Sequence, residues 1–519
     1  MESVYVGWWS ILPPLIAIVL ALLTKEVIVS LTVGVLSGTV IYAAATGGNL
    51  IIGPVETAFS LMTSSADIHL LLLLALLGTL VIVITKSGGS RVGGEYMASK
   101  LKTRHGTLLA TTLLGFIVFL SDTFSSLTVS TVMKPVTDKN RVSRAKLAYI
   151  LDATAAPICI LAPVSTWAPG VIACIPENDY FYGIQAYIKQ IPYNYYALLT
   201  VIMLLALSVL NLEYGPMAKV EQLAAETGNV GKIDSAVEDE VTISDKGRLI
   251  DMVLPVVVLI GVSILAMLQT GGYWSQNRSI SEAFAECASS QSMETGCFFG
   301  LLTAFLLYVP RGLMTFKEFM RSFVEGVKSM ADAYIILLLA WGLGGVCRTL
   351  LQTGPFVSNV IVESNIPIGL LPAIIFFVAA ALSFATGTSW GTFGIMTPLV
   401  FSICETAAPS LLVISFSAVL GGSVFGDHCS PISDTTIIAS AAAGCDHLLH
   451  NKTQIPYAFT VAAVCIVGYL VGGFTDGSCI IPLIVSVTLM IVVLFVLHKK
   501  FGKRRDNAET AVDETVVMQ

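Results

Sequence analysis

The chain has 519 residues, of which 55% are hydrophobic and only 12% are charged, and its mean hydropathy is +0.81. One soluble core cannot bury so much apolar surface, so the composition excludes a soluble globular protein and predicts an all-α polytopic membrane protein. The formal net charge of −7 says little about partners, because orientation in a membrane follows the distribution of Lys and Arg.

Apolar segments near the length needed to cross a bilayer recur along the whole chain. We expect membrane spans at 8–24, 27–45, 68–85, 147–170, 193–211, 252–269, 297–309, 331–350, 411–443, 457–474 and 479–497. The first of these lacks a basic start and a cleavage site, which favours a retained span.

Lys and Arg are distributed unevenly between these spans. They cluster in 86–106, 134–146, 310–328 and the stretch after residue 499, which we therefore expect on the cytoplasmic side. The connections 46–67, 351–365 and 401–410 contain no Lys or Arg, and 170–192 and 270–296 contain one each, so these should lie outside. Two further apolar stretches, 107–133 and 366–400, then have both of their ends on one side. They are predicted to be re-entrant hairpins pointing in opposite directions, with tips near 121–126 and 386–389.

The two hairpins share a sequence pattern at one fixed offset. Thr123-Phe124-Ser125-Ser126 followed by Met133-Lys134-Pro135 matches Thr386-Gly387-Thr388-Ser389 followed by Met396-Thr397-Pro398. After each hairpin comes a long segment that a proline should break, Pro157 in the first half and Pro431 in the second. We therefore predict two inverted-topology repeats, each with five transmembrane helices and a hairpin. The predicted regions are 1–211 for the first repeat, 212–250 for a cytoplasmic linker, 251–474 for the second repeat, and 475–519 for a final helix and tail.

Polar residues gather at the hairpin tips and at the helix breaks. A broken helix exposes unpaired backbone groups, and nearby hydroxyls and carboxylates can complete an oxygen cage for a dehydrated Na⁺. The predicted ion- or substrate-binding residues are Asp427, Asp434, Ser430, Ser433, Thr386, Thr388, Ser389, Asp122, Thr123, Ser125, Ser126, Asp152 and Thr154. Among them Asp427, Asp434, Thr388 and Ser389 are predicted to hold Na⁺, and Asp427 and His428 are predicted to take part in proton binding or pH sensing.

Each of these predictions has a plainer alternative. Single Ser and Thr hydroxyls in membrane helices often bond a carbonyl of their own helix, and His428 is equally consistent with a packed, hydrogen-bonded histidine. Gly387-Thr388-Ser389-Trp390-Gly391 also fits a serine-hydrolase pattern, but an intramembrane protease using Ser389 and His428 conflicts with the duplicated plan. Cys287 and Cys297 share one predicted loop and would be able to form a disulfide in an oxidising compartment.

The tracts Gly387–Thr392 and Gly426–Thr436 resemble the NhaC family of bacterial Na⁺/H⁺ antiporters, and the resemblance covers most of the chain. It implies a multi-pass protein of the bacterial inner membrane that exchanges Na⁺ for H⁺, surrounded by lipid, with no enzymatic activity, no cofactor and no nucleic-acid partner. Members that resemble these antiporters carry malate, lactate or amino acids. A coupled organic acid or amino acid, with Trp390, Trp167 and Phe124 lining its pocket, therefore stays open, as does a homodimer.

Overall fold

A computed structural model describes residues 3–502 except 25, 65, 67, 90–100, 102, 177–180, 182, 211, 232–245, 354, 357, 358, 360–366 and 432. Every regular element in these residues is helical. Eight of the described helices are long and apolar enough to cross a membrane, or up to nine if the bent pair formed by Phe316–Ser329 and Tyr334–Leu350 is one span. The chain is therefore a multi-pass all-α membrane protein, as its composition predicts.

The helices follow one another in two series of similar order. The first contains α1 (Leu12–Thr24), α2 (Val27–Thr46), α3 (Gly53–Ser64), α4 (Ile68–Ser87), α6 (Arg104–Ile117), α7 (Asp122–Lys139), α8 (Arg144–Cys159), α9 (Trp167–Cys174), α10 (Gly183–Gln190), α11 (Tyr195–Leu210) and α12 (Gly215–Thr227). The second contains α13 (Leu249–Thr270), α14 (Ile280–Ala285), α15 (Ser289–Tyr308), α16 (Phe316–Ser329), α17 (Ala331–Gly345), α19 (Leu371–Thr386), α20 (Ser389–Ala407), α21 (Leu412–Cys429), α22 (Asp434–Ala443) and α23 (His447–Phe474), and α24 (Ile480–Phe501) ends the chain's described helices. A π-helical turn, η3 (Val346–Leu350), continues α17.

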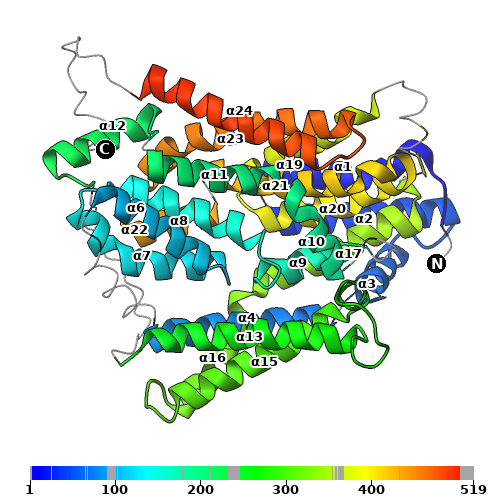
Figure 1. The fold of residues 1–519 in the computed structure, drawn as a ribbon. Helices are drawn as coiled ribbons and strands as arrows, with labels where there is room; N and C mark the ends of the chain where they lie inside the picture. The colour runs from blue at the N-terminus through cyan, green and yellow to red at the C-terminus, as the bar shows by residue number, and fades with distance from the viewer. Residues whose placement is uncertain are drawn as a thin grey trace.

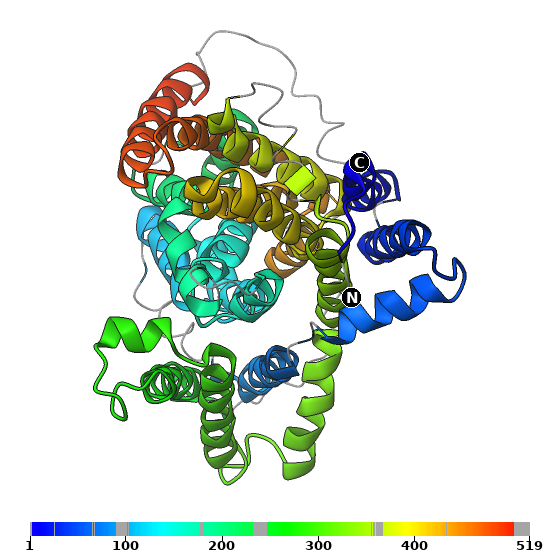
Figure 2. The same ribbon diagram turned by 90° about the vertical axis from the view of Figure 1, so that its right-hand side faces the viewer.

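Two peripheral groups of helices exchange members between the halves. Helices α2 and α3 pack with α17 from the second half, with α1 packed on α2, and α13, α15 and α16 pack with α4 from the first half. The second group forms the lower layer in Figure 1, and Figure 2 shows the blue helices α1 to α3 on another side of the same body. Because α3 packs on α17 and α4 packs on α16, α3 corresponds to α16 and α4 to α17 in the order of the two halves, as expected for repeats of one helical plan. The hydropathy pattern did not predict α3 and α16.

The hairpins and broken helices form the central body, and they also pack across the halves. Helix α9, which follows the first break, lies against α20, whereas α22, which follows the second break, lies against α7 and α8. Each break is therefore closed by the hairpin of the other half. This arrangement brings polar residues from both halves into one interior.

The two hairpin tips differ in detail. The second hairpin turns at Gly387, whose φ of 68° lies in the left-handed region that glycine adopts without strain. The first turns at 118–121, so Thr123–Ser126 lie inside α7 and not at the tip as predicted. Helix α7 begins about one turn further ahead of its proline, Pro135, than α20 does ahead of Pro398.

The two broken helices also differ from the prediction in one respect. The second break falls between Cys429 and Asp434, around Pro431, as expected. In the first half Pro157 lies inside α8, which continues to Cys159, and the break occupies 160–166. A proline removes only one amide hydrogen bond within a helix. The end of α8 is instead fixed by donors to its last carbonyls, from the Ser165 hydroxyl to Cys159 O at 2.7 Å and from the Tyr187 hydroxyl to Ile160 O at 2.8 Å.

Two smaller expectations have different outcomes. Cys287 and Cys297 are both free thiols, and Cys297 is buried within α15, so the structure does not pair them. The linker 212–250 is helical in α12, but 232–245 lie outside the described residues, as do most of the basic loop 86–106 and the tail after residue 502.

Candidate functional site

Asp427 lies where three helix ends meet. It occupies the last turn of α21 and is 1% exposed. The Ser389 hydroxyl and backbone amide donate to its Oδ2 at 2.7 and 3.3 Å, and the Ser433 hydroxyl donates to its Oδ1 at 2.6 Å. Since Ser389 begins α20 and Ser433 caps the N-terminus of α22, the positive ends of two helix dipoles face this carboxylate.

Hydroxyl oxygens extend this cluster along the first turn of α22. The Ser433 and Thr435 hydroxyl oxygens are 3.0 Å apart, and the Thr436 amide donates to Ser433 Oγ at 3.3 Å. Carboxylate and hydroxyl oxygens are the ligands that a hard cation prefers. The predicted residues Asp427, Ser389 and Ser433 are thus brought together, although they come from separate helices.

Asp152 forms a second cluster beside the first. It comes from α8 and is completely buried, and its Oδ2 accepts from Gln454 Nε2 at 2.6 Å and from the Thr436 hydroxyl at 3.0 Å. Its Oδ1 has no hydrogen-bond partner among the described residues, and His428 Nε2 lies 3.9 Å away. A buried carboxylate oxygen without a donor is costly and requires an explanation, and a bound proton or cation supplies one.

His428 is fully hydrogen-bonded as a neutral imidazole. Its Nε2 lies 3.1 Å from the backbone oxygen of Asp152, which only accepts, and its Nδ1 lies 3.1 Å from the Tyr196 hydroxyl, which can donate to it. The hydrogen-bond partners thus assign the tautomer. This geometry favours the packed-histidine alternative over proton binding. It also removes the support for a protease, because the Ser389 hydroxyl pairs with Asp427 and not with His428.

The first hairpin contributes a separate polar group. Asp122 begins α7, and its Oδ2 accepts from Trp167 Nε1 at 3.1 Å. No hydrogen bond among the described residues joins Asp122 to Asp427 or Asp152. Aromatic side chains link the two regions instead. The ring centroids of Trp167 on α9, which donates to Asp122, and Trp390 on α20, which follows Ser389, are 6.0 Å apart.

The remaining predicted residues occupy several environments. Thr154 and Thr386 donate to carbonyls of their own helices, Ile150 O at 2.7 Å and Leu382 O at 2.9 Å, as the packing alternative proposes. Ser125 and Ser126 are buried in α7, Thr123 is exposed, Thr388 is half-buried before α20, and Ser430 is buried with its amide bonded to Asp427 O. Asp434 begins α22, but its side chain lies outside the described part of the structure.

Sequence reasoning missed Gln454, which joins Asp152 to the end of α21. Its Nε2 also donates to His428 O at 2.7 Å, and Asn451 Nδ2 donates to Cys429 O at 3.1 Å, so both satisfy carbonyls at the end of α21. The signal was present in the sequence, since His447, His450, Asn451 and Gln454 recur at the spacing of one helix face. The predicted span began only at residue 457.

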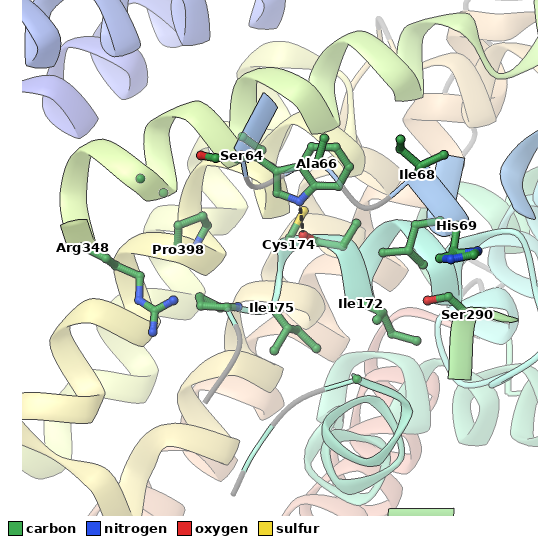
Figure 3. Close-up of a pocket in the computed structure, with 18 of the residues that line it drawn as sticks. Ser64, Ala66, Ile68, His69, Ile172, Cys174, Ile175, Ser290, Arg348 and Pro398 are labelled. Carbon is green, nitrogen blue, oxygen red and sulfur yellow. Dashed lines mark hydrogen bonds between the residues drawn. The ribbon is translucent and has the colours of Figure 1, made fainter. Parts of the chain in front are cut away.

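A cavity of about 820 Å³ lies elsewhere, and three connections predicted to be external line it (Figure 3). It is bounded by residues of 46–67, 170–192 and 270–296 together with α17 and η3. Arg348 of η3 faces it and pairs with Glu405 at 3.2 Å. The Trp341 indole, also on its wall, donates to Ala173 O of α9. The cavity therefore reaches the far end of the helix whose start contacts Asp122.

Comparisons with known proteins show the family to which this chain is similar. A model described as the Na⁺/H⁺ antiporter family matches residues 169–474. An uncharacterized protein of Haemophilus influenzae is 37% identical over 506 residues, which cover 95% of this chain and 96% of that protein. The malate-2H(+)/Na(+)-lactate antiporter of Bacillus subtilis is 31% identical over 35% of this chain and 39% of its own length. The solved YdaH transporter of Alcanivorax borkumensis is 13% identical with a TM-score of 0.48, over 81% of this chain and 88% of that one.

Proposed function

This chain belongs to the Na⁺/H⁺ antiporter family, and on that premise we propose that it exchanges Na⁺ for H⁺ across a bacterial inner membrane. The proposal rests above all on Asp152, a fully buried carboxylate whose Oδ1 lacks a hydrogen-bond partner among the described residues. Beside it Asp427 is equally buried and is surrounded by hydroxyls. Groups that are this costly to bury in a membrane protein mark ion pathways.

Competition for these carboxylates accounts for exchange. When Asp427 is ionised, its oxygens and those of Ser389 and Ser433 form a ligand set for Na⁺, after the two hydroxyls rotate their hydrogens away from the ion. When Asp427 is protonated, the charge that holds Na⁺ is gone. A site that holds either ion, but not both, exchanges one for the other.

Alternating access follows from the origin of the residues. Asp427 and Ser433 belong to the second broken helix, whereas Asp152 belongs to α8 of the first half. A small displacement of α22 along α8 would separate Thr436 from Asp152 and change which side reaches the ions. The external cavity and the basic segment 134–146 would then mark the two exits.

The direct test is Na⁺ binding to the purified protein at several pH values. Protonation removes a ligand charge, so apparent Na⁺ affinity should fall as the pH drops, by about tenfold per pH unit where one proton is displaced. Linkage requires that bound Na⁺ release the same proton. A Na⁺ affinity that is constant between about pH 5 and pH 9 would contradict direct competition at the carboxylates.

A second candidate is a Na⁺- or H⁺-coupled carrier of an organic acid or amino acid. The cavity of about 820 Å³ has the size of sites for small organic ligands, and Arg348 on its wall suits a carboxylate. Transport in liposomes with a panel of organic solutes separates the candidates. Proton flux that requires a solute and is lost in Arg348→Gln would favour this carrier, and solute-independent flux would favour simple exchange.

A further inference from the structure

A third polar cluster lies between the carboxylates and the protein surface, at the start of α23. Three acceptors converge on the single hydroxyl of Ser440. His450 Nδ1 lies 2.7 Å from its oxygen, His447 Nδ1 lies 3.1 Å from it, and Thr436 O lies 2.7 Å from it. The Ser440 hydroxyl has only one hydrogen to give.

The opposite nitrogens of both imidazoles face oxygens that only accept. His447 Nε2 lies 2.6 Å from Pro431 O, and His450 Nε2 lies 2.8 Å from Gln454 Oε1. The orientation of the Gln454 amide is fixed, because its nitrogen donates hydrogen bonds to Asp152 Oδ2 and His428 O, which leaves its oxygen facing His450. Both imidazoles therefore carry a hydrogen on Nε2.

With both imidazoles neutral, both Nδ1 atoms are bare and face the same Ser440 oxygen. The single hydrogen of the Ser440 hydroxyl can be donated to only one Nδ1 atom. The other Nδ1 then faces the Ser440 oxygen without a hydrogen between the two acceptors. One added proton removes this conflict, because one imidazolium donates to Ser440 while Ser440 donates to the other ring. Thr436 O loses little, since it already accepts the helical hydrogen bond within α22. A second proton would place two positive charges side by side.

We propose that His447, Ser440 and His450 form a binding site for one excess proton, distinct from the carboxylates that exchange the ions. As a proton-loading site this cluster rests on the proposed Na⁺/H⁺ exchange, but its proton binding does not. Loading moves a proton from water onto an imidazole nitrogen and release returns it, so no other reactant is required.

The position of the cluster suits loading from the cytoplasm. His447 is half-buried at the surface, and His450 is completely buried beneath it. The adjacent turn lies against the basic segment 134–146, because Arg144 donates to Ala443 O. We expect that side to be cytoplasmic. At its inner end the cluster reaches Asp152 through Gln454, which contacts His450, and through Thr436, which contacts Ser440. A side-chain amide does not relay protons. Gln454 therefore prevents direct proton transfer between His450 and Asp152, while the two groups still interact electrostatically.

The charges around the cluster come from every helix that packs against it. The described charged groups on these helices include Asp152, Arg144 and Lys146 on α8, Lys134 and Asp138 on α7, Asp427 and His428 on α21, and Asp446 and Lys452 at the start of α23 and within it. Arg144 pairs with Asp138, and Lys146 pairs with Glu213. Asp152, which has no Lys or Arg partner among the described residues, is the carboxylate that the hydrogen-bond chain from His450 reaches through Gln454.

Nitrogen-15 NMR of histidine-labelled, full-length protein in lipid nanodiscs tests proton binding directly. The chain has six histidines, and His447→Gln and His450→Gln variants assign the two signals. Because the two rings share one hydroxyl group, we expect them to titrate as a pair, with two steps separated by more than about one pH unit. Ser440→Ala removes the shared oxygen and should reduce this separation. Identical titrations with and without the Ser440 hydroxyl, or two rings that stay neutral down to about pH 5, would overturn the proposal.

Transport measurements separate this proposal from the proposed exchange. Ser440→Ala should shift the pH dependence of Na⁺-driven proton flux without changing Na⁺ affinity at alkaline pH. The matched control is His498→Gln, at the end of α24, which should leave that profile unchanged. A paired titration in a protein without exchange would support the site and remove its loading role. Exchange in a protein whose two rings titrate independently would refute the site alone.

Discussion

The two broken helices use one backbone arrangement with different chemistry. At the first break, between α8 and α9, the exposed carbonyls accept from neutral groups, the Tyr187 and Ser165 hydroxyls. At the second break, between α21 and α22, the Gln454 and Asn451 amides likewise donate to the exposed carbonyls. This break also contains a buried carboxylate, Asp427, which accepts from the Ser433 hydroxyl. A broken helix is therefore not itself an ion site. The buried carboxylate distinguishes the second break.

Asp152 makes the comparison sharper. It belongs to α8, the helix of the first break, yet its carboxylate contacts Thr436 and Gln454 of the second half. The first half of the chain thus contributes a carboxylate, Asp152, to the break in the second half. Because burying a carboxylate costs several kcal/mol unless it is paired, two buried carboxylates close together are what the proposed ion site requires.

The largest expected effect is at Asp427. Asp427→Asn removes a charged ligand worth about 3 kcal/mol, which corresponds to about 100-fold weaker Na⁺ binding. The matched control is Asp122→Asn, at the start of α7, where the carboxylate is half-buried and bonded to Trp167. Calorimetric titration of Na⁺ compares the two. Equal losses in both variants would contradict the distinction between the halves.

A smaller effect is expected at Asp152, because it lies beside the hydroxyl cluster and contacts it only through Thr436. Asp152→Asn should weaken Na⁺ binding by about tenfold, or 1.4 kcal/mol, and should reduce the number of protons that Na⁺ releases. Proton release is followed with a pH indicator in weakly buffered solution. Unchanged release would show that Asp152 is a structural acceptor for Gln454.

Removing neutral ligands should cost less than removing a charge. The double variant Thr388→Ala with Ser389→Ala loses one hydroxyl bond to Asp427, worth about 1 kcal/mol, or about fivefold in Na⁺ affinity. Since the Ser389 amide still donates to Asp427, the fold of α20 should persist. Thr154→Ala, whose hydroxyl serves its own helix, is the control, and it should bind Na⁺ normally.

The smallest effect on transport is expected at the first break. Tyr187→Phe removes the donor to Ile160 O and should lower stability by about 1 kcal/mol, while Na⁺ affinity stays at the wild-type value. Thermal unfolding in detergent measures the first quantity and Na⁺ titration the second. A loss of Na⁺ affinity without a loss of stability would mean that the first break also binds the ion.

The sequence alone determined the membrane class, most of the membrane-length helices, a helix–turn–helix within each of 107–133 and 366–400, and the position of the second break, whereas re-entry of these two segments stays a prediction. These features depend on local signals: the length of apolar runs, polar residues within them, and glycine or proline at turns. The same signals placed Asp427, Ser389 and Ser433 among the site residues, because all three interrupt apolar sequence. They misplaced the first break, since Pro157 is tolerated within α8 while the carbonyls beyond it are satisfied by distant donors.

Only the tertiary structure decided which polar groups meet. Asp152 and Gln454 are 302 positions apart, and their contact depends on α22 and α23 packing against α8, which no local pattern encodes. The same packing sets Asp122 apart from the carboxylates and gathers His447, Ser440 and His450 around one hydroxyl. The physical reason is that a residue's propensity and hydropathy act over a few positions, whereas hydrogen-bond partners inside a helical membrane protein come from whichever helices pack together.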